Sequence, residues 1–391
     1  MHANGRIISL FLALAVFTAG HVGAQQLRTD RLSAALEPEI RRMMVEGALP
    51  SATIAIVADG RIVWSGAFGE SNLWARTPAT TNTVYLIGST FKAMSAVALL
   101  QQHEQGRFQL DDPVNRYLRG LHIRNERPDQ PVTFRHLLTH TSGLPVAFGP
   151  HPVWGETLPL PLDRYLADSL AVVSAPLDSV RYSNLAFSLV AYLVEELSGI
   201  PYRTYMQDSI FSPLEMTSLA FAPTPAMEER LAIPYVVDSL TARNVPVTRL
   251  RANVWPAGIV WGTVIDLGHW LIANLSDGWY RGRRILPEAT HAQMFALQYP
   301  QFAAASADFG GEVTGYGLVW RLAERRSERV FAHSGSVPGY TALIMGNLDQ
   351  RTGIAIMTNG NRAHSQLYRF ADAALEVLRR ERKGGGEEPE R

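Results

Sequence analysis

The order of strand-like and helix-like segments is the feature that most limits the folds open to this chain of 391 residues. Near the start, two β-rich runs in SATIAIVADGRIVWSGAFG flank Asp59 and Gly60, a pair that is a strong hairpin signal. Near the end, residues 316–360 hold four further strand-like runs joined by short polar turns. The two β-rich ends therefore enclose a middle section with mostly helical spacing and many prolines.

This order predicts an α+β fold in which one antiparallel sheet, built from both ends of the chain, is flanked by helices. We expect one domain over residues 25–383, with a mainly helical lobe at about 110–262 inserted into the α/β lobe. A final helix at about 366–380 precedes a glycine-rich polar tail at 384–391, which we expect to be disordered. A ligand site is expected at the seam between the lobes.

The first 24 residues have the pattern of a secretory signal peptide. Arg6 precedes an apolar run from Ile7 to Ala19, and small residues lead up to Ala24. We expect cleavage after Ala24 and a secreted or periplasmic protein with no stable membrane insertion afterwards. The alternative is an uncleaved membrane anchor, which the shortness of the apolar run argues against.

The charge balance and the cysteine content narrow the function classes. Lys plus Arg and Asp plus Glu each number 36, so the basic excess typical of nucleic-acid binding is missing and no nucleic-acid partner is expected. The absence of cysteine removes thiol nucleophiles, disulfides and zinc–thiolate sites. The oligomeric state is left open.

Ser89 and Lys92 are three residues apart at the expected start of an apolar helix. Residues at this spacing share one face of a helix, and the free N–H groups of a helix start stabilise an anion there. A serine hydroxyl needs a nearby base to act as a nucleophile, and a buried lysine has a lowered pKa. The alternative is a serine N-cap beside a lysine that reaches solvent.

Tyr182 and Asn184 lie two residues apart just before a second apolar helix. Residues two apart in an extended segment point to the same side. A lysine ammonium next to Tyr182 is expected to lower the pKa of the phenol, which makes it a candidate general base. Asn184 offers both a carbonyl and an NH₂ group to a substrate amide. A packed tyrosine and an asparagine cap are the alternative.

The third candidate segment, FAHSGSVPGY, lies at the end of an expected strand. His333 is succeeded by small residues including Gly335, so a substrate can lie along this edge. The backbone N–H groups of Ser336 and Ser89 are candidates for an oxyanion hole. For His333 alone, an ordinary buried or surface histidine is an equal alternative.

Taken together, the motifs S-x-x-K, Y-x-N and H-S-G resemble those of the serine β-lactamase and penicillin-binding-protein superfamily. VTFRHLLTHTSGLP at 132–145 is similar to a signature of its class C β-lactamase-related branch, the S12 serine peptidases, and so are LDDPVNRYL, YGLVW and HSGSVPGY. The resemblance runs from about Leu36 to Leu378. It implies the β-lactamase/transpeptidase-like fold.

The resemblance also implies roles for these residues. Ser89 would be the nucleophile that forms an acyl-enzyme, and Lys92 and Tyr182 would transfer protons, with Tyr182 the base toward Ser89. Asn184, His333 and Gly335 would bind substrate, and the N–H groups of Ser89 and Ser336 would form the oxyanion hole. No metal and no cofactor are implied. The substrate would be a small ester, amide or peptide.

His333 departs from the lysine of class C β-lactamases and resembles the H-x-G version of esterases, D-amino-acid peptidases and broad amidases. We therefore expect a weak β-lactamase at most, and an activity whose pH dependence comes from His333, since histidine titrates near pH ~6.5. Esterase, D-amino-acid or cell-wall peptidase and weak β-lactamase remain open within this class.

Three other functions are weighed against this one. His136 and His140 have a spacing suited to a metal, but the H-E-x-x-H glutamate is missing because Leu137 stands there. No G-x-S-x-G pentad of an α/β-hydrolase is present. A catalytically idle receptor for penicillin- or peptidoglycan-like ligands is the remaining alternative, although a binder gains nothing from a buried lysine.

Overall fold

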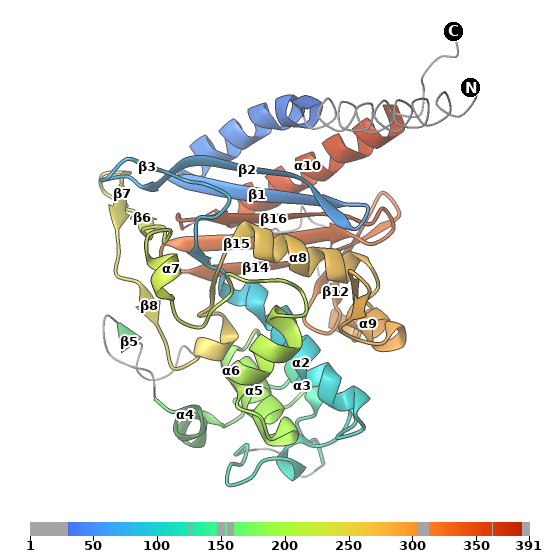
Figure 1. Ribbon diagram of the computed structural model, residues 1–391. Helices are drawn as coiled ribbons and strands as arrows, with labels where there is room; N and C mark the ends of the chain where they lie inside the picture. Colours follow the sequence, from blue (N-terminus) through green and yellow to red (C-terminus); the bar gives the residue numbers. More distant parts are fainter. Residues whose placement is uncertain are drawn as a thin grey trace, which may run out of the picture.

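An antiparallel sheet of eight strands forms the centre of the molecule (Figure 1). The computed structural model describes residues 30–384 except 126, 128, 147–152, 155–159, 303–312 and 362. The strand order is β12-β13-β14-β15-β16-β1-β2-β3, and every neighbouring pair is antiparallel. The strands are β1 (Ser51–Ala58), β2 (Arg61–Asn72), β3 (Thr77–Pro78), β12 (Val313–Tyr316), β13 (Arg321–Arg325), β14 (Glu328–Val337), β15 (Tyr340–Asn347) and β16 (Thr352–Thr358).

Both ends of the chain supply this sheet, which confirms the predicted α+β fold. Asp59 and Gly60 turn β1 into β2 with φ angles of 52° and 69°, the left-handed values that a tight hairpin requires. On its other edge β1 pairs with β16, with Ala55 opposite Ala355. Helices cover both faces, so every residue of β1 is buried and its sequence is apolar with little alternation.

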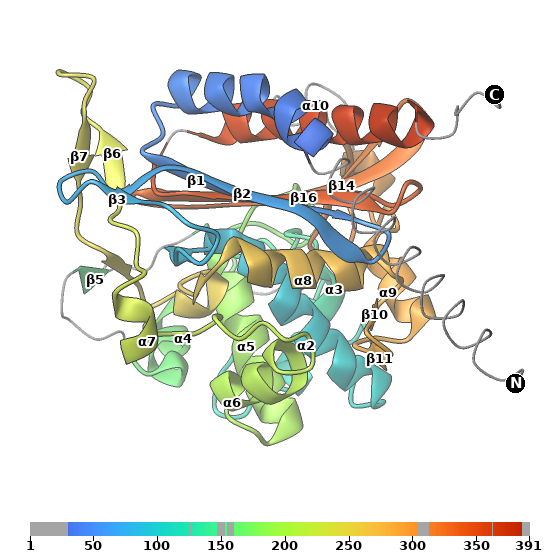
Figure 2. The ribbon, with the colours of Figure 1, turned by 45° about the horizontal axis from the view of Figure 1, so that its top comes forward.

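Two helices from opposite ends of the chain lie side by side over one face of the sheet (Figure 2). They are the helix at residues 30–46 and α10 (His364–Gly384), and they bury Leu36 and Phe370 against the strands. The final helix is longer than the predicted 366–380, and Gly384 belongs to it rather than to the tail. The rest of the tail lies outside the described residues.

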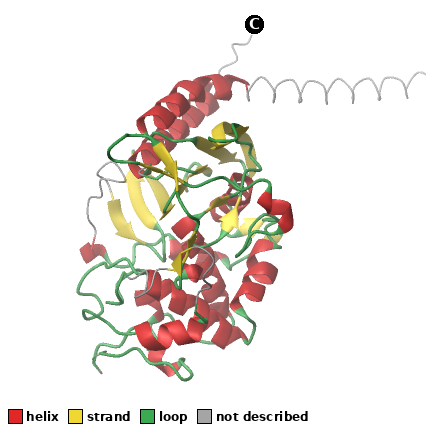
Figure 3. Cartoon of the chain, turned by 90° about the vertical axis from the view of Figure 1, so that its left-hand side faces the viewer, coloured by secondary structure: helices red, strands yellow, loops and turns green. Residues whose placement is uncertain are grey.

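The opposite face of the sheet is covered by α8 (Val264–Leu275), beyond which the other helices gather (Figures 1 and 3). Thr263 and Asp266 cap α8 reciprocally, which satisfies free N–H groups of its first turn. The helices beyond are α2 (Lys92–Glu104), α3 (Phe134–Leu138), α4 (Leu162–Ser169), α5 (Asn184–Ser198), α6 (Tyr202–Met206), α7 (Pro225–Glu228) and α9 (Glu288–Met294).

The helix α5 is the central element of this helical region. Its residues 184–194 are all buried, and it packs against α2, which comes earlier in the chain. Gly199 ends it in the left-handed conformation, with φ of 73°, as the sequence predicted. The boundaries of a separate inserted lobe stay a prediction.

Two other predictions bear on the termini and strands. The proposed signal peptide, residues 1–24, lies outside the described residues. Over the part of the chain that the structure describes, no helix combines the length and the apolar character needed to cross a membrane. The run at 316–323, predicted as one strand, bends at residues 317–320 and is divided between β12 and β13.

Candidate active site

Ser89 is placed by a short ladder between distant segments. The strand β4 (Tyr85–Leu86) pairs with β9 (Trp261–Gly262), and the Ile87 N–H donates to the Val260 carbonyl over 2.9 Å. The chain then enters a 3₁₀ turn, Gly88–Phe91, and only afterwards the α-helix α2. Ser89 was predicted at the start of the α-helix, but it lies in the 3₁₀ turn that precedes it. Its side chain is partly exposed.

Lys92, the first residue of α2, is fully buried. Its Nζ atom lies 2.8 Å from Ser89 Oγ, 2.9 Å from Asn184 Oδ1 and 2.7 Å from the Ala257 carbonyl oxygen. Burial holds the pKa of this amine well below its usual value, because the charged form loses its hydration. The predicted Ser89–Lys92 contact is present, and the lysine does not reach solvent.

Tyr182 and Asn184 approach Lys92 from the start of α5. Ser183 is extended, with φ of −134° and ψ of 117°, and caps α5 through its side chain. The Lys92 Nζ atom lies 4.9 Å from the centroid of the Tyr182 ring. The carbonyl oxygen of Asn184 accepts from Lys92, so this part of the amide orients the lysine.

The predicted lowering of the Tyr182 pKa is wrong. Tyr182 is half-buried, and this partial burial raises the pKa of its phenol above the ordinary value of 10 because the phenolate would lose hydration. A hydrogen bond with Ser89 acts in the opposite direction without reversing the shift. The phenol is therefore neutral at neutral pH and is suited to donate a proton.

His333 lies in β14, with 4% of its surface exposed. Its Nδ1–H donates to the Ser334 carbonyl over 2.8 Å, so the neutral ring presents Nε2 as an acceptor. Burial, followed by the charges of Lys92 and Arg321, lowers the pKa of His333 to about 3. The prediction that His333 titrates near neutral pH is therefore wrong, and the ring is uncharged there.

Glycines let the end of β14 approach the Ser89 turn backbone to backbone. A Cβ atom on Gly335 would lie 2.2 Å from the Ile87 carbonyl oxygen and 2.9 Å from Ser89 N. Gly88 has a φ of 57°, and a Cβ there would lie 2.9 Å from Ser336 N. The two backbone N–H groups predicted as an oxyanion hole, those of Ser89 and Ser336, therefore lie on either side of this glycine contact.

A pocket of about 260 Å³ opens at this point. Five of the predicted residues line it: Ser89, Tyr182, Asn184, His333 and Ser336. The lining also has an apolar side that consists of Val146, Leu250, Ala252, Val254, Ile259 and Val337. The rest of the lining consists of Ala257, Gly258, Arg321, Ser334 and His364. Arg321 donates to the Tyr316 hydroxyl over 3.2 Å. Lys92 lies beneath the pocket and meets it through Ser89.

His136 and His140, whose spacing would suit a metal ion, form hydrogen bonds with two different backbone N–H groups. His136 Nδ1 accepts from the Thr133 N–H over 3.2 Å, and His140 Nδ1 accepts from the Ser183 N–H over 3.1 Å. Within the described residues, no three His, Asp or Glu side chains lie close enough together to hold a metal ion.

Sequence reasoning missed two contributors to the site. The Ala257 carbonyl accepts from Lys92, and any residue type could supply it, so no side-chain pattern marks the position. His140 packs against Tyr182, with ring centroids 4.3 Å apart. The motif that contains His140 was identified, but the contact with Tyr182 depends on a chain reversal that the sequence alone does not specify.

The sequence matches a family model named Beta-lactamase over residues 36–378. Among the relatives of this chain, Protein flp of Staphylococcus aureus (strain COL) is 22% identical over 330 residues, which cover 82% of this chain. The chain spans 62% of the length of that relative.

Two solved structures have a fold similar to that of this chain. The octameric penicillin-binding protein homologue from Pyrococcus abyssi is 28% identical with a TM-score of 0.70, covering 88% of this chain and 76% of its own. The D-amino acid amidase from Ochrobactrum anthropi SV3, complexed with L-phenylalanine amide, is 22% identical with a TM-score of 0.75, covering 90% of this chain and 99% of its own. The second likeness bears on the fold alone.

Proposed function

The chain belongs to the beta-lactamase family, and from this premise we propose that it is a serine hydrolase that forms an acyl-enzyme at Ser89 on an ester or amide substrate. One observation carries the proposal: the fully buried amine of Lys92 lies 2.8 Å from the Ser89 hydroxyl. Among the described residues, no carboxylate forms an ion pair with this amine, so no counter-charge offsets the cost of burying its charged form. A lysine in this setting is suited to accept a proton.

Lys92 acts as the base toward Ser89, in place of the Tyr182 that the resemblance suggested. In its neutral form the amine donates its two N–H groups to Asn184 Oδ1 and the Ala257 carbonyl. Its lone pair then faces Ser89 Oγ and takes the hydroxyl proton as Oγ bonds to the substrate carbonyl carbon. The N–H groups of Ser89 and Ser336 stabilise the resulting oxyanion.

Tyr182 acts as the acid when the intermediate collapses. Its neutral phenol gives a proton to the leaving oxygen or nitrogen, and the proton held by Lys92 restores the phenol. Water then attacks the acyl carbon and gives a proton to the neutral Lys92 amine. The Ser89 oxygen leaves and takes this proton from Lys92, and the carboxylic acid product is released. The raised pKa of Tyr182 supports the donor role, since a phenolate has no proton to give.

An apolar acyl group fits the site best. The side of the pocket with Val254, Ile259 and Val337 offers no hydrogen-bonding side chain, and His333 is neutral at neutral pH. Each methylene buried there contributes about 0.8 kcal/mol. The enzyme therefore prefers butyryl or hexanoyl esters to acetyl esters, and Ile259→Asp lowers hexanoate hydrolysis more than acetate hydrolysis.

The proposal includes the location of the enzyme. The pattern of residues 1–24 supports export and action outside the cytoplasm. Sequencing the N-terminus of the protein recovered from a bacterial host tests this: a start at Gln25 is expected, and an intact Met1 in the mature protein contradicts cleavage.

Nitrophenyl ester hydrolysis and mass spectrometry of the intact protein test the chemistry. The wild type is exposed to a fluorophosphonate, to penicillin G and to an acyl-D-Ala-D-Ala mimic, and the lifetimes of the adducts are followed. Ser89→Ala is expected to abolish both adduct and turnover. The matched control is Ser95→Ala on α2, since the Ser95 hydroxyl bonds to the Tyr202 hydroxyl outside the pocket.

The outcomes separate the two candidate classes. Turnover by the wild type and Ser95→Ala, with none by Ser89→Ala, supports the hydrolase. A stable adduct at Ser89 without turnover of any of these compounds supports the idle receptor instead. A wild type that forms no adduct at Ser89 and turns over none of these compounds contradicts the proposed function.

A further inference from the structure

His140 is a fully buried residue that holds the segment carrying Tyr182 and Asn184. Its Nδ1 atom accepts the backbone N–H of Ser183 over 3.1 Å. Its own carbonyl oxygen accepts the N–H of Arg181 over 2.7 Å. The residues directly before and after Tyr182 are thus both bonded to the same histidine.

The imidazole ring also packs on the Tyr182 ring. The two centroids are 4.3 Å apart with an angle of 33° between the planes, and the Phe187 ring lies 5.3 Å from His140. Lys92 Nζ lies 4.9 Å from the Tyr182 centroid. The Tyr182 ring is therefore in contact with the Lys92 amine and with the His140 imidazole.

A histidine is a costly choice at this position. Its Nε2 atom is buried and has no hydrogen-bond partner among the described residues, which costs free energy. Its backbone φ is 58°, a left-handed value that is uncommon outside glycine, although histidine adopts it more often than most side chains do. Phenylalanine would fill the same space without an unsatisfied N–H but could not accept the Ser183 N–H. What the histidine supplies is a flat ring with an acceptor at Nδ1.

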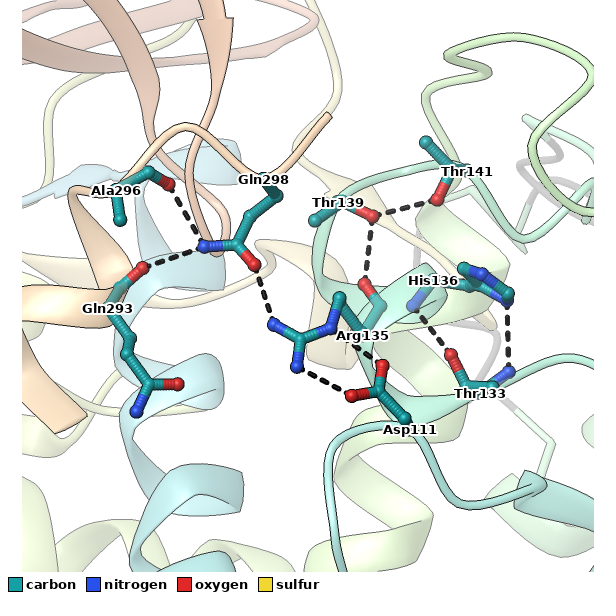
Figure 4. A network of polar contacts seen from close by, with 9 residues as sticks. All are labelled: Asp111, Thr133, Arg135, His136, Thr139, Thr141, Gln293, Ala296 and Gln298. Atoms are coloured by element: carbon teal, nitrogen blue, oxygen red, sulfur yellow. Dashed lines mark hydrogen bonds and ion pairs between the residues drawn. The ribbon is translucent and has the colours of Figure 1, made fainter. Parts of the chain in front are cut away.

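Neighbouring threonines hold this unusual backbone (Figure 4). The Thr139 hydroxyl donates to the Arg135 carbonyl over 2.8 Å and lies 2.8 Å from the Thr141 hydroxyl. Arg135 is itself bound to Asp111 by two hydrogen bonds. The turn that presents His140 is therefore anchored independently of Tyr182.

We propose that His140 is a positioning residue of the hydrolase, which acts through Tyr182 by fixing the phenol against the Ser89–Lys92 pair. The inference rests on the proposed function and adds to it a group outside the S-x-x-K, Y-x-N and H-S-G motifs. Small displacements of a proton donor reduce the rate of the chemical step with less effect on substrate binding. His140 is therefore expected to affect kcat more than KM.

The matched control is His136, which makes an equivalent contact without reaching the site. Its Nδ1 accepts the Thr133 N–H over 3.2 Å as part of the cap of α3 (Figure 4). The ring that it approaches, at 6.2 Å between centroids, is that of Tyr299, which does not line the pocket. His136→Asn should therefore lower the thermal midpoint and leave kcat unchanged.

The experiment compares His140→Asn and His140→Phe with the wild type, and repeats His140→Asn in a Tyr182→Phe background. Asparagine tolerates the left-handed backbone and keeps an acceptor but loses the ring, whereas phenylalanine keeps a ring and loses the acceptor. The readouts are kcat and KM for a nitrophenyl ester and the rate of fluorophosphonate labelling of Ser89. Circular dichroism shows which of the two His140 variants are folded, and the kinetic comparison with the wild type uses the folded ones.

The expected result is a loss of kcat of about tenfold or more, with KM changed less than about threefold. In the Tyr182→Phe background, His140→Asn should slow Ser89 labelling no further. A kcat within about twofold of wild type, or the same loss with and without the Tyr182 hydroxyl, overturns the inference alone. A wild type that neither turns over esters nor labels at Ser89 overturns the proposed function and this inference together.

Discussion

Lys92 Nζ lies 2.8 Å from Ser89 Oγ, and its two other contacts are to oxygens that cannot donate a proton to it, Asn184 Oδ1 and the Ala257 carbonyl. A neutral amine has two N–H groups and one lone pair, which matches two pure acceptors and one hydroxyl. Of the 36 basic residues in the chain only Lys92 and Lys383 are lysines. Arginine cannot take this role, since it does not lose its proton in proteins.

The titration of Lys92 can be observed directly because the chain has two lysines. In protein labelled with ¹⁵N-lysine, we expect one Nζ signal to titrate well below pH 10.5, since burial lowers the pKa of Lys92. The other signal, from Lys383, serves as the internal reference, and Lys92→Met assigns the spectrum. Two signals that both titrate near the ordinary lysine value would rule out Lys92 as the base.

The pH dependence of kcat/KM should follow Lys92 and not His333. Activity requires the neutral amine, so it falls as the pH drops through the lowered pKa of Lys92. The pKa of His333 is already about 3, so His333→Gln should reduce activity without moving this acid limb. The measurement is kcat/KM against pH for both proteins, with folding checked at each pH. If the acid limb of kcat/KM moved to another pH in His333→Gln, His333 and not Lys92 would be the group that sets the pH dependence.

Gly335→Ala should separate catalysis from stability. The added Cβ would lie 2.2 Å from the Ile87 carbonyl oxygen, so β14 must move away from the Ser89 turn. We expect overpacking to cost about 1–3 kcal/mol of unfolding free energy and the loss of an oxyanion donor to cost about 100-fold in kcat.

The control for this variant is Gly106→Ala. Gly106 has a φ of 71° and nothing within 4 Å of an added Cβ, so strain alone should cost about 1–2 kcal/mol. Its kcat should be that of the wild type. Equal kcat values in the two alanine variants would show that the close approach of β14 is not needed for the reaction.

The stability of the protein should fall between pH 6.5 and pH 4. Burial lowers the pKa of His291 to about 4, so the unfolded chain binds a proton in this range that the folded chain does not. The contribution of neutral His291 to the free energy of unfolding is complete above pH 6.5, declines as the pH falls below that value and is largely lost by about pH 4. His136, with a pKa also lowered to about 4, adds to the same loss.

His291→Phe should flatten this dependence. Each unit of pKa lowering corresponds to about 1.4 kcal/mol, so the variant should keep on the order of 3 kcal/mol that the wild type loses by pH 4. Urea unfolding at pH 7 and at pH 4.5 measures the difference. An unchanged slope would mean that His291 is solvated in the folded protein.

Much of this architecture follows from the sequence, because the hairpin at Asp59 and the strand-like run around His333 are local signals. The residues Ser89, Tyr182 and His333 were identified from motifs, and the structure brings them to one pocket. Their ionisation was not predictable. The pKa of Tyr182 and that of His333 depend on how completely neighbouring elements exclude water, and that is a property of packing.

The sheet joins both ends of the chain, and β14 from the C-terminal part lies against the Ser89 turn, which has a consequence for how the protein matures. The segment with Ser89 and Lys92 leaves the ribosome about 240 residues before the β14 edge that completes the pocket. Pairings of such long sequence separation form slowly. A nascent or C-terminally shortened chain would therefore carry its nucleophile in an inert state, and reactivity would be acquired only when the last strands dock.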